Sequence, residues 1–142
     1  MGKYLMDNGW IQKTVRVKND YNKVCTFLEF YAKENNIDAR KIYNQALLFS
    51  INHLITDGFH YEIETFGGRR EPKGFLVEES TLAIVGDNFT RYKEIYCDLS
   101  GKKLLVSEFY ELLIYIFCTN NLDKKYLVFL SDIDWGVINT RK

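Results

Sequence analysis

The sequence predicts an α+β protein of 142 residues, and three patterns support this prediction. Residues 10–18 alternate between apolar and polar side chains, as a strand with one buried face does. Residues 19–56 contain two stretches with apolar side chains three and four positions apart, which is typical of amphipathic helices. Residues 57–142 hold shorter apolar runs between turn residues, which predict a mainly antiparallel sheet with one helix.

The strand at residues 10–18 sorts its side chains into two sets. The apolar set is Ile11, Val15 and Val17, and the polar set is Gln12, Thr14, Arg16 and Lys18. Side chains alternate between the two faces of a strand, so the polar set lies on the face away from the core. Lys13 interrupts the apolar set, and its long stem can carry the ammonium group to solvent.

Two helices are expected after this strand. Asn19 or Asp20 offers an N-cap for the first helix, which should end near Asn35 and Asn36, since asparagine tolerates the left-handed backbone of a helix exit. A second helix should run from a cap at Asp38 to Asp57 and Gly58.

The remaining residues are expected to form strands and one helix, without an internal repeat. The expected elements are a strand over 59–66, a loop over 67–74 with the only proline, a strand over 81–88, a hairpin of 92–99 and 102–106, a helix over 108–118 capped by Ser107, and a strand over 124–134. Two units are therefore predicted, residues 1–56 and residues 57–142.

Composition excludes some classes of function. The formal net charge is zero, although residues 1–56 carry +3 and residues 57–142 carry −3, so anion binding is expected in the first unit. The three cysteines have no metal or disulfide spacing and no signal segment is recognised, which indicates reduced thiols and a cytoplasmic location. No apolar run is long enough for a membrane span. No catalytic constellation, metal cluster or cofactor motif is found, so the prediction is a protein that is not an enzyme.

The strand and two helices of residues 10–56 are too short for an independent core, because one strand leaves its ladder groups unpaired. Two copies could pair their strands, which would bury the apolar set and leave the polar set on a two-stranded ribbon. A two-stranded ribbon fits the major groove of DNA. Alternatively, the unit packs onto the C-terminal sheet as one α+β domain, and the polar set is an ordinary solvated face.

Residues 10–56 resemble the ribbon-helix-helix repressors of the Arc type, through "QKTVRVKND", "YNKVCTFLEFYAKEN" and "IDARKIYNQALLFSINHLI". The resemblance implies that Gln12, Thr14 and Arg16 contact bases. It places phosphate contacts at the start of the second helix, on Asp38, Ala39 and Arg40. Lys18 and Lys41 are also predicted to contact phosphates. The turn "NNID" departs from the family, which usually has glycine there, and it brings Asp38 near a phosphate.

The leading expectation is a homodimeric DNA-binding transcriptional regulator whose residues 57–142 mediate oligomerisation or bind a protein partner. The alternative is a small phage or mobile-element protein that inhibits a host or defence protein such as a nuclease, with Glu78, Glu79, Asp132 and Asp134 imitating nucleic acid. Residues 67–74 offer a weaker candidate, a loop for an anion or a partner with Arg69, Arg70 and Lys73.

Overall fold

The computed structural model describes residues 3–5, 9–64 and 68–140 and has an α+β fold, as the sequence predicts. In chain order the elements are β1 (Lys3–Leu5), β2 (Trp10–Lys18), α1 (Asn19–Glu34), α2 (Ile42–Asp57), β3 (Tyr61–Ile63), β4 (Arg70–Glu78), α3 (Glu79–Ser100), α4 (Val106–Asn121), α5 (Lys124–Phe129) and β5 (Val137–Asn139). The strands form two small antiparallel sheets, with strand orders β1-β2-β4 and β3-β5.

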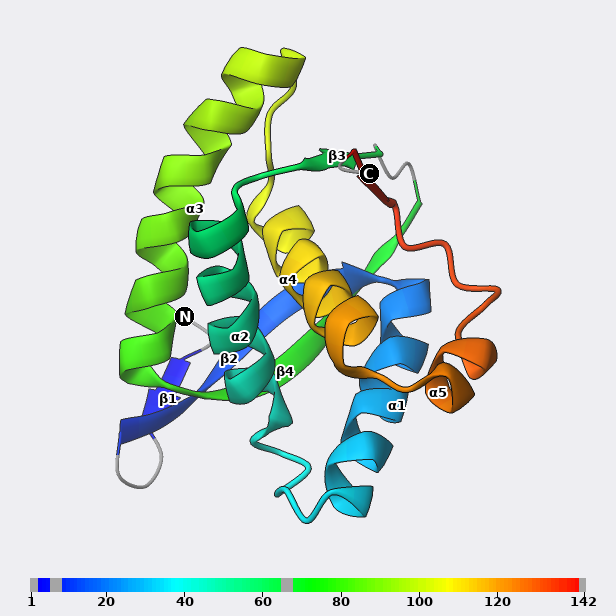
Figure 1. The fold of residues 1–142 in the computed structure, drawn as a ribbon. Coiled ribbons are helices and arrows are strands. Elements are labelled where there is room, and N and C mark those ends of the chain that lie inside the picture. Colours follow the sequence, from blue (N-terminus) through cyan, green and yellow to red (C-terminus); the bar gives the residue numbers. More distant parts are fainter. Residues whose placement is uncertain (1–2, 6–8, 65–67, 141–142) are drawn as a thin grey trace.

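The order strand, helix, helix, strand occurs twice along the chain (Figure 1). The first half is β2, α1, α2 and β3, and the second is β4, α3, α4 and β5, with the short helix α5 added before β5. Two of the matching pairs agree in length, since β2 and β4 have 9 residues each and α2 and α4 have 16 each, whereas α1 has 16 residues and α3 has 22. The expectation of no internal repeat is therefore wrong at the level of structure.

The two halves are joined by an antiparallel ladder between β2 and β4. Thr14 lies opposite Gly74 at its centre, Trp10 pairs with Glu78 at one end, and Lys18 pairs with Arg70 at the other. Each residue of β2 thus has a counterpart 60 positions later in β4, and a pseudo-two-fold axis passes through the central pair. The strand partner that a second copy was expected to supply is in the same chain.

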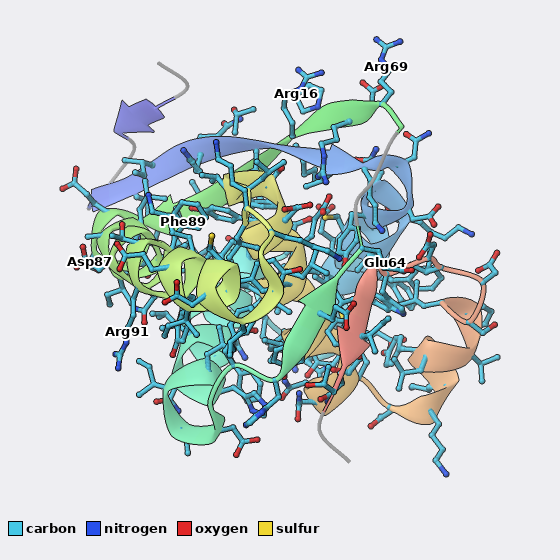
Figure 2. The ribbon with its side chains drawn as sticks, turned by 90° about the horizontal axis from the view of Figure 1, so that it is seen from above. Arg16, Glu64, Arg69, Asp87, Phe89 and Arg91 are labelled. Atoms are coloured by element: carbon cyan, nitrogen blue, oxygen red, sulfur yellow. The ribbon has the colours of Figure 1, made fainter. Side chains whose placement is uncertain are left out.

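The helices cover one face of the β2–β4 ribbon and leave the other face uncovered (Figures 1 and 2). Val15 and Val17 of β2 and Phe75 and Val77 of β4 point into the core and are buried. α2 and α4 meet over this layer, where the Ser50 hydroxyl donates to the Leu113 carbonyl at 2.5 Å. The predicted units 1–56 and 57–142 therefore share one core.

Polar contacts fasten each half to the other. The backbone N–H of Lys18, at the start of α1, donates to the Glu111 carboxylate of α4 at 2.8 Å. The backbone N–H of Glu78, at the start of α3, donates to the Asn44 side chain of α2, also at 2.8 Å. Glu111 also forms an ion pair of 2.6 Å with Arg70 of β4. In both halves, the residue between strand and helix is thus held by the second helix of the opposite half.

The largest error of the sequence prediction lies in residues 79–106. The strand over 81–88 and the hairpin that follows are wrong, because α3 runs unbroken to Ser100 and only then turns at Gly101 in the left-handed conformation. The buried side chains of α3 are Thr81, Val85, Tyr92 and Tyr96, and their spacing of four, seven and four is that of one helix face.

Other boundaries also differ. The loop predicted over 67–74 lies outside the described residues at Gly67, and β4 occupies the predicted loop from Arg70 onward. The strand tolerates Pro72 because β4 is an edge of its sheet. The second helix begins at Ile42 rather than Asp38, and the fourth at Val106, one residue before the expected cap. The strand predicted over 124–134 is wrong, since α5 occupies its first half.

Candidate nucleic-acid interface

The uncovered face of the ribbon, called the outer face below, is formed by alternate residues of both strands. Its central members are Gln12, Thr14 and Arg16 of β2 and Pro72, Gly74 and Leu76 of β4. The ladder pairs them across the ribbon, Gln12 with Leu76, Thr14 with Gly74, and Arg16 with Pro72. All three β2 residues are exposed, so the side chains predicted to contact bases lie together on one solvent-facing surface.

Two of these side chains lean across the ribbon toward β4. Gln12 lies over Gly74, where an added Cβ atom would come within 2.5 Å of the Gln12 side-chain nitrogen, so a larger residue at position 74 would make Gln12 move. Arg16 donates from its guanidinium group to the Arg70 carbonyl at 2.8 Å. A guanidinium group has five N–H donors, and Figure 2 shows Arg16 pointing away from the helices. Arg16 therefore retains donors for a ligand on the outer face.

The prediction that Lys18 contacts a phosphate is wrong. Lys18 is buried, with 5% of its surface exposed, although it is the next residue after Arg16 in the alternating polar set of the strand. The chain turns into α1 at this residue, and its ammonium group lies 5.7 Å from the centre of the Tyr21 ring. The side chain is therefore directed into the protein instead of toward the surface that would face DNA.

The start of α2 lies beside the outer face. Arg40 and Lys41 are exposed just before the first turn of α2, and the Lys41 ammonium group lies 4.8 Å from the centre of the Trp10 ring. A hollow of about 220 Å³ connects this region to the ribbon, and its lining is Gln12, Glu29, Ala39, Arg40, Tyr43, Gly74 and Leu76. The structure thus brings the predicted base contact Gln12 together with the predicted phosphate contacts Ala39 and Arg40.

Carboxylates in this region are paired with basic side chains. Asp38 forms an ion pair with Arg40 at 3.2 Å and accepts the Arg40 backbone N–H at 2.9 Å. These bonds to Arg40 hold the pKa of Asp38 below its usual value. Glu29, in the hollow, forms an ion pair with Lys73 at 3.3 Å. The acid that the resemblance would bring near a phosphate is therefore partly neutralised by its neighbour.

The basic residues of the predicted anion loop do not gather into one site. Arg69 is exposed and forms an ion pair with Glu71 at 3.3 Å. Arg70 is directed inward to Glu111, and Lys73 to Glu29. These two carboxylates belong to different helices, α4 and α1, so the stretch offers no common anion pocket. Arg69 alone projects outward, near Arg16 in Figure 2.

The acidic residues that might imitate nucleic acid are also separated. Glu78 pairs with Trp10 at one end of the ladder, and Glu79 follows it. At the other end, the backbone N–H of Asp134 donates to Asp20, two residues after Lys18, and Asp132 forms an ion pair with Lys23 at 3.5 Å. These carboxylates do not form one acidic face.

A third strand, β1, shortens the part of the ribbon that has only two strands. β1 pairs with residues 11–13 of β2 and leaves Thr14 to Lys18 with β4 as their only ladder partner among the described residues. Strands lie about 4.8 Å apart, so the two-stranded part suits a groove about 12 Å wide, whereas a third strand adds width at the Gln12 end. The Arg16 end is thus the narrower of the two.

The sequence reading missed the β4 contribution to the outer face. Glycine and proline at residues 67–74 indicated a loop, yet Lys13 and Val17 recur as Lys73 and Val77 at the counterpart positions. Two identities in nine residues were the available signal.

Comparison with protein-family models, curated proteins and solved structures gives no match for this chain. None of the helices in the described ranges is long and apolar enough to cross a membrane, and the same residues contain no group of three potential metal ligands.

Proposed function

We propose that this protein binds double-stranded DNA by placing the β2–β4 ribbon in the major groove, and that it acts as a sequence-specific transcriptional regulator. The observation that carries the proposal is the antiparallel ribbon whose face away from the helices presents Gln12, Thr14 and Arg16. This is the arrangement that the ribbon-helix-helix resemblance implies, except that one chain supplies both strands.

The exposed side chains of β2 suit the base edges of the major groove. An arginine can bond guanine at two atoms, a glutamine can do the same with adenine, and a threonine can bond a base or touch the methyl group of thymine. Arg16 is placed on the narrower end of the ribbon, where a bidentate contact needs close approach. Gln12 lies over β4, near the middle of the ribbon.

Phosphate contacts would come from the start of α2. The exposed Arg40 and Lys41 stand beside the Gln12 end of the outer face, with Ala39 lining the hollow between them and the ribbon. Such contacts fix the position of a protein on the duplex but do not read its sequence. Arg69, exposed at the opposite end, is suited to a second contact with the backbone.

A homodimer remains a prediction, but its interface would differ from the one expected. The β2 ladder is already satisfied by β4, so a second copy would have to bind through another surface. Residues 57–142 supply one strand of the ribbon and the larger part of the core, and a role for them in binding a protein partner is likewise a prediction. The nuclease-inhibitor alternative is less well supported, because its acidic residues are divided between the ends of the ribbon.

The test is fluorescence anisotropy of the parent protein with labelled random duplex DNA at 50 and 200 mM salt. Affinity should fall steeply with salt, because bound protein releases counterions from the phosphates. A preferred binding site is then selected from a random duplex library with the parent protein, and Arg16→Ala should bind this selected site more weakly than the parent by about 1–3 kcal/mol. Arg91→Ala is the matched control, since Arg91 is also exposed but lies on α3, away from the ribbon (Figure 2).

Equal affinities of Arg16→Ala and Arg91→Ala for the selected site would remove the outer face from the proposal. A parent protein that does not bind duplex DNA at either salt concentration would refute the function itself. In that case, a stable complex with a purified nuclease would favour the inhibitor.

A further inference from the structure

Resting on the proposed function, the register of the ribbon points to a further property, the symmetry of the DNA site. We infer that each ribbon recognises a non-palindromic site in which one half-site contains an A·T pair read by Gln12 and Leu76, and the other contains a guanine read by Arg16. A ribbon made from two identical strands presents the same side chains at both ends. Here the two strands differ at every central position of the outer face.

The pseudo-two-fold axis through Thr14 and Gly74 defines the two ends of the ribbon. One end presents Gln12 and Leu76, and the other presents Arg16 and Pro72. The axis exchanges Gln12 with Pro72 and Arg16 with Leu76, so each polar residue is exchanged with an apolar one. The ends therefore have different chemistry even though their backbones correspond.

The chemistry of each end favours a different base pair. Glutamine suits adenine, and an apolar side chain such as Leu76 suits the methyl group of thymine, so the first end is complementary to A·T pairs. Arginine suits guanine, while proline has neither a side-chain donor nor a backbone N–H. Pro72 therefore adds no hydrogen bond at the second end, and readout there depends on Arg16.

The starts of α2 and α4 differ in the same way. Arg40 and Lys41 precede α2, whereas the residues 64 positions later, before α4, are Leu104 and Leu105. Leu104 is buried, and the Leu105 backbone N–H donates to the Glu108 carboxylate at 2.9 Å. The start of α4 therefore has the Glu108 carboxylate, whereas the start of α2 has the exposed basic side chains of Arg40 and Lys41.

The charges at the two ends of the ladder reinforce the difference. Glu78 closes the strand at the Gln12 end, and the exposed Arg69 precedes the strand at the Arg16 end. Both half-sites therefore retain attraction to phosphates, while the base-reading groups are distributed unequally.

The experiment selects binding sites from a random 30-base-pair duplex library with the full-length parent protein. The segment that one ribbon contacts is located by footprinting and divided at its centre, and each half is joined to its own inverted copy, which gives two palindromes. The parent should bind the selected duplex at least about tenfold more tightly than either palindrome, because each palindrome loses one kind of base contact.

The variant Pro72→Gln/Leu76→Arg is a second measurement, since it presents Gln and Arg at both ends of the ribbon. Circular dichroism would establish that it is folded, and its selected site should become palindromic. A palindromic sequence within the segment that one ribbon contacts, or equal affinity for the three duplexes, would overturn the inference while leaving DNA binding intact. Failure of the parent to enrich or bind any duplex would overturn the proposed function and the inference with it.

Discussion

Phe75 offers a test of whether the two halves form one cooperative unit. It is fully buried, and its ring stacks on Tyr43 of α2 at 4.7 Å and on Tyr110 of α4 at 6.1 Å between ring centres. Phe75→Ala should lower the free energy of unfolding by about 3–5 kcal/mol. A small domain has about 5–15 kcal/mol in total, so this is a large fraction of its stability. With a slope of about 2 kcal/mol per M, the urea midpoint should fall by roughly 2 M.

The assay is urea unfolding followed by tryptophan fluorescence. Trp10 begins β2 in the first half, whereas Trp135 precedes β5 in the second half and packs against Tyr21 and Tyr115 at 5.8 and 5.4 Å. The variants Trp10→Phe and Trp135→Phe each leave one reporter. Phe75→Ala, introduced into both, should shift both transitions by the same amount of free energy.

Leu99→Ala is the control, since Leu99 is 76% exposed and its truncation should change stability by less than about 0.5 kcal/mol. If the Trp10 transition kept its midpoint while the Trp135 transition moved, the halves would unfold separately. That result would refute the argument that residues of both halves share one core.

Two further predictions concern buried polar and thiol groups. Glu111→Ala should lower the free energy of unfolding by about 3–5 kcal/mol, because Arg70 loses its buried carboxylate. The double variant Arg70→Met/Glu111→Leu should lower the free energy of unfolding by less. Urea unfolding that ranks the two variants the other way would contradict this reasoning. At pH 8, a thiol reagent should label Cys97 in the folded protein, and Cys25 and Cys118 only after unfolding. Burial raises the pKa of Cys25 to about 12 and also raises that of Cys118, so native labelling of either would show that the core opens readily.

Much of the first half could be predicted from the sequence because its signals are local. The alternation in residues 10–18 and the three-and-four spacing in residues 19–34 depend on neighbouring positions, and the structure has β2 and α1 at these places. The outward direction of Gln12, Thr14 and Arg16 follows from the alternation of side chains along a strand. The burial of Lys18 does not follow from this alternation, since it depends on where the chain turns and on Glu111, 93 residues away.

The second half was harder because tertiary contacts override its local signals. Pro72 and Gly74 read as turn residues, yet an edge strand tolerates the proline, and the glycine makes room for Gln12. In α3, the apolar run before Gly86 favoured a strand and Gly86 favoured a turn after it, but one helix face packs on the core through Val85 and Tyr92. β4, which pairs with β2 along its whole length, is more than fifty residues away, so no local pattern could identify it.

The presence of both ribbon strands in one chain also affects how the fold responds to dilution. A ribbon assembled from two copies obeys mass action, so its strands separate when the protein concentration falls below the dissociation constant. In this protein the connecting chain keeps β4 close to β2, and the ladder forms as an intramolecular step. Formation of the ribbon should therefore not depend on protein concentration between nanomolar and micromolar, and a cell with only a few molecules would still contain complete ribbons.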